Sequence, residues 1–158
     1  MTPATFINVA WAPAMTLLPQ RMDTAEAKAL VLAICLQESR LVHRRQIGGP
    51  ARGFAQFEHG GGVRGVLSHP ASRDHIRAVL DALEYDHSPD TSYAAIEHND
   101  VLACCFARLL LWTLPDALPV RGESDEAWDQ YISAWRPGRP HRHTWNALYE
   151  QAWAESRG

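Results

Sequence analysis

The apolar residues of this chain recur with the period of an α-helix, and no stretch shows the sustained alternation of a β-strand. The pattern, together with polar caps and prolines, predicts helices over residues 3–18, 24–39, 70–85, 91–98, 101–114, 124–135 and 144–156. The fifth of these is apolar on nearly all sides, which predicts a buried helix at the centre of the core. We therefore expect a mainly α fold, in a single domain over residues 1–158.

Glycine, proline and polar residues mark the expected breaks between helices. Pro13 is expected to kink the first helix. Asp23 and Glu26, three residues apart, predict a capping box at the start of the second helix, with Asp23 as the cap. Residues 40–66 are rich in glycine and arginine and predict an irregular loop, with a short strand or helical turn near 54–57. This loop should border a cleft between the second and third helices.

The second predicted helix ends with a carboxylate on its apolar face. Glu38 follows Ile34 by four residues and Cys35 by three, so it lies on the same stripe. Apolar neighbours and the negative end of the helix dipole both disfavour its charged form, so its pKa should be raised, as a general acid requires. The alternative is a side chain that extends to solvent or pairs with Arg40 or Arg44.

A second motif follows this helix after a loop. Glu38-Ser39-Arg40, together with the segment Gly53-Phe54-Ala55-Gln56-Phe57-Glu58, resembles the signature of goose-type lysozymes and lytic transglycosylases. In that superfamily a Glu-Ser step closes a buried helix, a Gly-Leu-Met-Gln-like segment follows, and goose-type members have an acid two residues after the Gln. The resemblance covers residues 23–70. Residues 60–66 and 135–138 are similar to parts of small lysozyme-like proteins encoded by tailed phages.

The resemblance implies a lysozyme-like fold that cleaves the β-1,4 bond between the amino sugars of peptidoglycan. Glu38 would be the general acid, and Ser39 and Gln56 would hold the sugar or orient the acid. If Glu58 faces Glu38, it would activate water and the enzyme would be a muramidase; otherwise Glu38 alone would yield the anhydro product of a lytic transglycosylase. Some members place a tyrosine opposite the acid, and Tyr131 is the candidate here. The motif favours the hydrolase.

Two other functions are compatible with the sequence. The superfamily's usual Ala-Tyr-Asn-Ala-Gly segment is missing, as it would be in a non-enzymatic descendant that serves as a structural part of a phage particle. Residues 40–77 hold seven arginines against two acids, whereas residues 78–120 hold seven acids against one arginine. The basic segment could attract anionic peptidoglycan or nucleic acid, or it could match the acidic segment within the molecule. Nucleic-acid binding leaves Glu38 unexplained, so nucleic acid is not the expected partner.

Composition indicates where the protein is made and whether it holds a metal. No apolar run reaches the eighteen residues of a membrane span, and no basic region follows Met1 as in a secretory signal. Cys35, Cys104 and Cys105 lie in apolar stretches and predict reduced core cysteines. The eight histidines lack metal-site spacing, so neither a metal nor a cofactor is expected. By resemblance, the protein would be made in a host cytoplasm and act on the wall as an endolysin or virion component, with other virion proteins as further candidate partners.

Overall fold

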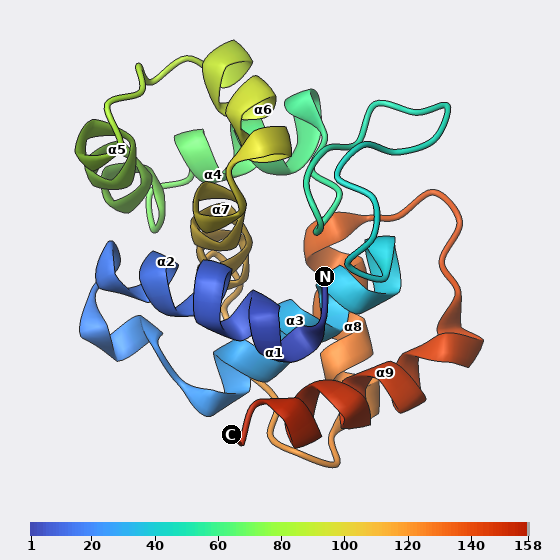
Figure 1. Ribbon diagram of the computed structural model, residues 1–158. Helices are drawn as coiled ribbons and strands as arrows, with labels where there is room; N and C mark the ends of the chain where they lie inside the picture. Colours follow the sequence, from blue (N-terminus) through green and yellow to red (C-terminus); the bar gives the residue numbers. More distant parts are fainter. Residues whose placement is uncertain (158) are drawn as a thin grey trace.

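The computed structural model describes residues 1–157, and this part of the chain is mainly helical (Figure 1). The predicted α class is therefore confirmed. In chain order the elements are α1 (Pro3–Phe6), η1 (Ile7–Trp11), α2 (Ala12–Thr16), η2 (Gln20–Met22), α3 (Ala25–Ser39), η3 (His59–Val63), α4 (Arg64–Ser68), α5 (Arg73–Ala82), α6 (Pro89–His98), α7 (Asp100–Trp112), α8 (Ser124–Trp135) and α9 (Arg142–Glu155).

Helix α7 is the centre of the structure, as its apolar sequence predicts. Every residue from Leu102 to Leu111 is buried, and helices from both ends of the chain pack around it (Figure 1). Asn99 caps the helix by accepting a hydrogen bond from the backbone N–H of Leu102 at 3.0 Å. The helix ends at Trp112, two residues before the predicted end. Helix α3 packs between α7 and α9, so its last turn is held from two sides.

The N-terminal helix is broken where Pro13 was expected to kink it. Thr2 caps α1, but the chain then widens into the π-helical η1 before α2 begins. The backbone N–H of Ala12 bonds to the carbonyl of Ile7, five residues back. Proline has no N–H to donate and its ring crowds the preceding turn, so a wider turn before Pro13 relieves the conflict. The helix stops at Thr16, before the predicted end at residue 18.

The cap of α3 is one residue later than the capping box predicts. The cap is Thr24, whose hydroxyl accepts a hydrogen bond from the N–H of Ala27 at 3.1 Å. The Asp23 carboxylate instead accepts a hydrogen bond from the indole of Trp11 at 3.2 Å. Because Asp23 is used by a tertiary contact, the neighbouring threonine takes over the cap.

Residues 40–58 leave α3 through a sharp reversal and fold into antiparallel turns. Arg40 and Leu41 both have a φ of 57°, in the left-handed region that ends helices. Isolated β-bridges then join Arg45 to Arg52 and Arg52 to Phe57. These contacts hold the segment together without making a sheet.

The prediction of an irregular loop over residues 40–66 is wrong from His59 onward, where the π-helical η3, interrupted by non-helical backbone angles at Gly61, leads into α4. Three consecutive glycines suppressed the helical pattern in the sequence, because glycine is a poor helix former. Packing overrides this propensity, since Val63 and Val66 are fully buried in the core. At Gly62 a Cβ atom would lie 2.5 Å from the Phe57 ring, so only glycine fits.

The remaining helices lie close to their predicted positions. Helix α8 begins and ends where predicted, and α6 and α9 each begin two residues earlier. Helix α5 is shorter than the predicted 70–85, although Ile76, Val79 and Leu80 are buried as expected and Leu83 packs against the core. The three cysteines are free and buried, as predicted.

Some arginines of the basic segment 40–77 form ion pairs with carboxylates of the acidic segment 78–120. Arg44 forms a two-bond ion pair with Asp100, and its guanidinium lies 4.3 Å from the centre of the Phe54 ring. Arg45 and Arg52 both pair with Glu97. These contacts fasten the base of the 40–58 segment to α6 and α7. Among residues 1–157, no helix has the length and hydrophobicity that crossing a bilayer requires.

The shifted cap gives a test of the fold. We expect Thr24→Ala to lower the free energy of unfolding by about 1 kcal/mol, because the Ala27 N–H loses its acceptor at the start of α3. Thr24→Ser keeps the acceptor oxygen and should stay within about 0.5 kcal/mol of the wild type. Urea unfolding followed by circular dichroism measures both. Equal stability of all three proteins would show that Thr24 is not the cap.

Candidate functional site

A groove with a volume of about 520 Å³ opens beside the last turn of α3. One side is formed by parts of the 46–62 segment, and the other by the end of α8 and the connection that leads to α9. Leu110 of α7 also lines the groove. In Figure 1 the teal loop after α3 and the orange connection after α8 extend on the same side of the molecule.

Glu38 lies in the last turn of α3 and lines this groove. Its side chain is half-buried, and its carboxylate accepts a hydrogen bond from the hydroxyl of Tyr131. Burial raises the pKa of Glu38, the hydrogen bond from Tyr131 opposes that effect, and the nearby negative charge of Glu58 adds to it. The net shift is upward, in the direction that a proton donor near neutral pH needs. No ion pair joins Glu38 to Arg40 or Arg44 within the described chain.

Tyr131 comes from α8 and is held by an aromatic cluster. Its ring is almost fully buried and lies parallel to Trp145 of α9, with ring centres 5.2 Å apart. Trp128 packs against it edge-on at 5.5 Å. Burial and the adjacent Glu38 carboxylate raise the pKa of Tyr131, so the hydroxyl keeps its proton and acts as a donor. The ring therefore fixes where the Glu38 carboxylate lies.

Ser39 does not line the groove, so the prediction that it holds a sugar is wrong. Its side chain is buried, and its hydroxyl oxygen lies 2.7 Å from the carbonyl of Phe54 and 3.0 Å from that of Cys35. The same oxygen accepts a hydrogen bond from the N–H of Leu41 at 3.3 Å. Ser39 thus attaches the end of α3 to the second motif and has no free group for a ligand. The sequence also allows Ser39 to orient Glu38, and the buried position of Ser39 next to it is compatible with that role.

Gln56 lines the groove from a tight turn. Its φ is 54°, its backbone N–H bonds to the carbonyl of Gly53 at 3.0 Å, and its side-chain amide donates to the same carbonyl at 2.8 Å. Gly53 has a φ of 74°, and a Cβ there would lie 2.7 Å from the side chain of Ile96. The turn therefore depends on this glycine. The side-chain oxygen of Gln56 makes no hydrogen bond within the described chain and remains available to a ligand.

Glu58 is exposed and also lines the groove, just before η3 begins. The sequence places Gln56 and Glu58 on one side only if the segment is extended, and it is not extended. The turn at Gln56 brings both side chains to the groove by another route. Within residues 1–157, Glu58 forms no ion pair, so its carboxylate is open to a ligand or water.

Phe54 and Phe57 pack inward, against the core. Both are almost fully buried, and Phe57 lies edge-on to Phe106 with ring centres 5.9 Å apart. Phe54 approaches Phe6 in the same way at 6.4 Å. These rings anchor the turn that carries Gln56 and Glu58 to the core.

Several groove residues could not be identified from the sequence. The indole of Trp135 donates a hydrogen bond of 2.8 Å to the carbonyl of Ala55, which joins α8 to the turn. Gln37 donates to the carbonyl of His141 at 2.9 Å and accepts from the hydroxyl of Thr144 at 2.9 Å. Nothing in the local sequence distinguishes Gln37. Trp135 is four residues after Tyr131, and this spacing is a usable signal for a shared helix face.

Basic residues line the groove on the α8 side. Arg136, Arg139 and His141 all belong to the connection between α8 and α9. Arg136 has a φ of 48°, which turns the chain away at the end of α8. The carboxylates of Glu38 and Glu58 line the same groove, so it combines groups capable of proton transfer with the positive charges of Arg136 and Arg139.

No family model, no curated protein and no solved structure matches this chain. In the described part of the chain, no group of three or more histidine, cysteine, aspartate or glutamate residues is arranged to hold a metal ion.

The raised pKa of Glu38 predicts the pH dependence of stability. The folded state holds the proton more tightly than the unfolded state, so the contribution of Glu38 is complete below the unfolded pKa, near 4.5. It is lost as the pH rises through the folded pKa. The wild type should therefore lose stability relative to Glu38→Gln as the pH rises through this window. Urea unfolding at a series of pH values measures the difference.

Tyr131→Phe provides the matched variant. Loss of the hydrogen bond that favours the carboxylate should raise the pKa of Glu38 further and move the window to higher pH. Tyr85→Phe, a tyrosine outside the groove, should leave the window unchanged. A Glu38 that titrates below 4.5 in the wild type would contradict the assignment and indicate an ion-paired carboxylate.

Proposed function

We propose that the groove binds a glycan strand of peptidoglycan and that Glu38 is the general acid that cleaves its β-1,4 bond. The observation that carries this proposal is the half-buried carboxyl group of Glu38, with its raised pKa, in one groove with a second carboxylate, Glu58. Two carboxyl groups across a sugar-binding groove are the usual equipment of glycosidases. The volume of about 520 Å³ is also within the ~300–1,000 Å³ typical of ligand pockets.

The reaction would proceed in these terms. Glu38 donates its proton to the glycosidic oxygen while the bond from that oxygen to the anomeric carbon breaks, and positive charge develops on the sugar ring. Glu58 takes a proton from a water molecule whose oxygen bonds to the anomeric carbon. The products are two shorter glycans, one with a new reducing end. The Tyr131 hydrogen bond stabilises the Glu38 carboxylate that remains.

The charge distribution supports a peptidoglycan strand over nucleic acid. Peptidoglycan carries carboxylates on its peptide stems, which Arg136 and Arg139 at the groove could bind. Nucleic acid would need the arginines of the 40–77 segment, but Arg44, Arg45 and Arg52 are engaged by Glu97 and Asp100. We propose accordingly that the chain is a lysozyme-like protein related to those of tailed phages, which meets the wall as an endolysin or as part of a virion.

The general acid is tested by Glu38→Gln. The amide keeps the shape of the side chain but has no acidic proton, so lysis of purified peptidoglycan should fall by about 10²–10⁴-fold. Far-ultraviolet circular dichroism should show an unchanged helical spectrum. Glu155→Gln, at the exposed end of α9, is the control and should retain full activity. Wild-type turnover by Glu38→Gln would overturn the proposal, and so would a wild-type protein that leaves peptidoglycan intact.

The role of Glu58 is tested by Glu58→Gln and by the products. If Glu58 activates water, the variant should lose hydrolysis by about 10²–10⁴-fold. Mass spectrometry of the muropeptides that the wild type releases should show reducing ends. Anhydro ends, released equally by the wild type and Glu58→Gln, would instead mean that Glu38 works alone. That result would make the protein a lytic transglycosylase.

A further inference from the structure

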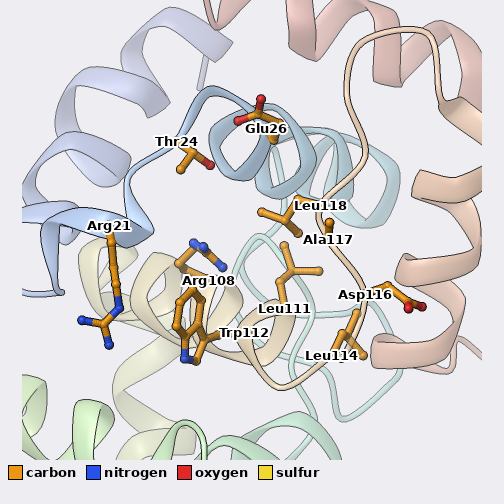
Figure 2. Close-up of a pocket in the computed structure, with 10 residues that line it drawn as sticks. All are labelled: Arg21, Thr24, Glu26, Arg108, Leu111, Trp112, Leu114, Asp116, Ala117 and Leu118. Atoms are coloured by element: carbon orange, nitrogen blue, oxygen red, sulfur yellow. The ribbon is translucent and has the colours of Figure 1, made fainter.

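A second cavity, with a volume of about 480 Å³, lies away from the groove (Figure 2). The groove includes Leu110 of α7, whereas this cavity includes Arg108, Leu111 and Trp112, which lie on other faces of that helix. Its remaining walls come from η2, the start of α3 and the connection that follows α7. None of the residues assigned to the groove lines it.

Arg108 is the unusual feature of this cavity. Its side chain is 2% exposed, although it carries a charge in the most buried helix of the protein. Its Nε donates one hydrogen bond of 2.8 Å to the carbonyl of Met22. A guanidinium group has five N–H donors, and the other donors of Arg108 have no acceptor in residues 1–157.

Among residues 1–157, no carboxylate forms an ion pair with this buried charge. Arg108 forms no ion pair within the described chain, and the carboxylate of Asp23 accepts from Trp11 instead. Burial lowers the pKa of Arg108 to about 10, and the more distant charge of Asp23 offsets this only in part. A buried cation is costly unless an anion or several acceptors satisfy it. The free donors of Arg108 line the cavity, so an anion there could satisfy them (Figure 2).

A second arginine, Arg21, lines the same cavity. The guanidinium of Arg21 lies 5.5 Å from the centre of the Trp112 ring, and that of Arg108 lies 5.2 Å from it. Cation–π contacts offset part of the charge, and an anion bound near both guanidinium groups would lower the repulsion between them. The cavity thus offers two guanidinium groups beside an aromatic surface.

The rest of the lining defines the kind of anion. Leu111, Leu114 and Leu118 provide an apolar wall next to Trp112 (Figure 2). Glu26 and Asp116 also line the cavity and form no ion pair in the described chain, so together they balance the two arginines. These carboxylates repel a dianion such as phosphate more strongly than a singly charged group, and phosphate has no apolar part to contact the leucines. A single negative charge on an apolar body matches both the donors and the wall.

We infer that this cavity binds a small organic monocarboxylate, with its carboxylate on Arg108 and Arg21 and its apolar part against Trp112 and the leucines. Arginine suits this role because its planar N–H groups match the two oxygens of a carboxylate. This inference is independent of the proposed glycan cleavage, because the two cavities share no residue.

Isothermal titration calorimetry of the full chain with hexanoate tests the inference. We expect one site with a dissociation constant on the order of 1 mM, given the few atoms of the probe. Hexanamide, the neutral counterpart, should bind at least about tenfold more weakly, because it lacks the charge that the guanidinium groups recognise. Inorganic phosphate should also bind more weakly than hexanoate. In NMR spectra, hexanoate should shift the indole N–H resonance of Trp112.

Variants locate the site. Arg21→Gln changes an exposed side chain, so the protein should fold normally and bind hexanoate about tenfold more weakly. Arg121→Gln, an arginine outside the cavity, and Glu38→Gln should both bind hexanoate like the wild type. No binding of hexanoate, equal binding of hexanamide, tighter binding of phosphate, or unchanged affinity in Arg21→Gln would each overturn the inference.

Discussion

The hydrogen bond between Tyr131 and Glu38 is the contact on which the candidate site depends. A carboxylate at the C-terminal end of a helix experiences the negative end of the helix dipole, and apolar surroundings disfavour its charge further. Without a donor, this side chain would be expected to turn toward solvent. The hydroxyl of Tyr131 keeps the carboxylate at the groove while burial keeps its pKa raised. Burial and the hydrogen bond shift the pKa of Glu38 in opposite directions, but together they hold its carboxylate at the groove.

The contacts behind this pair explain why the groove has a defined shape. Ser39, next to Glu38, bonds to the carbonyl of Phe54, and the indole of Trp135 bonds to the carbonyl of Ala55. Two consecutive carbonyls of the turn are thus held by two different helices. The buried rings of Phe54 and Phe57 secure the same turn from below. The position of Gln56 relative to Glu38 therefore depends on the core as much as on the loop.

The sequence predicts the helices well where one face is apolar and the ends are marked. The ends of α8 match the prediction, and α7 is central because it is apolar on all sides. Errors arise where a tertiary contact overrides a local preference. Asp23 is predicted to cap α3 but bonds to Trp11, and residues 64–66 are predicted as loop but begin α4, which buries Val66 in the core. These contacts join residues that are distant in the sequence, so a local pattern cannot predict them.

The candidate site was predictable to a similar degree. The sequence identifies Glu38 by its place on an apolar stripe and Tyr131 by resemblance. The burial of Ser39 and the turn at Gln56 were not predictable, because both depend on how the chain reverses at Arg40 and Gly53. Gln37 was also missed, since its partners lie more than a hundred residues away in the sequence.

The spacing of Tyr131 and Trp135 on α8 has a mechanical consequence. One side chain holds the carboxylate of Glu38 and the other holds the turn that carries Gln56, and both belong to one rigid helix. A small rotation of α8 about its axis would move both contacts together. The distance between the walls and the proton affinity of the acid would then change in a single motion. Ligand entry that displaced α8 would thereby alter the acidity of Glu38 without touching it.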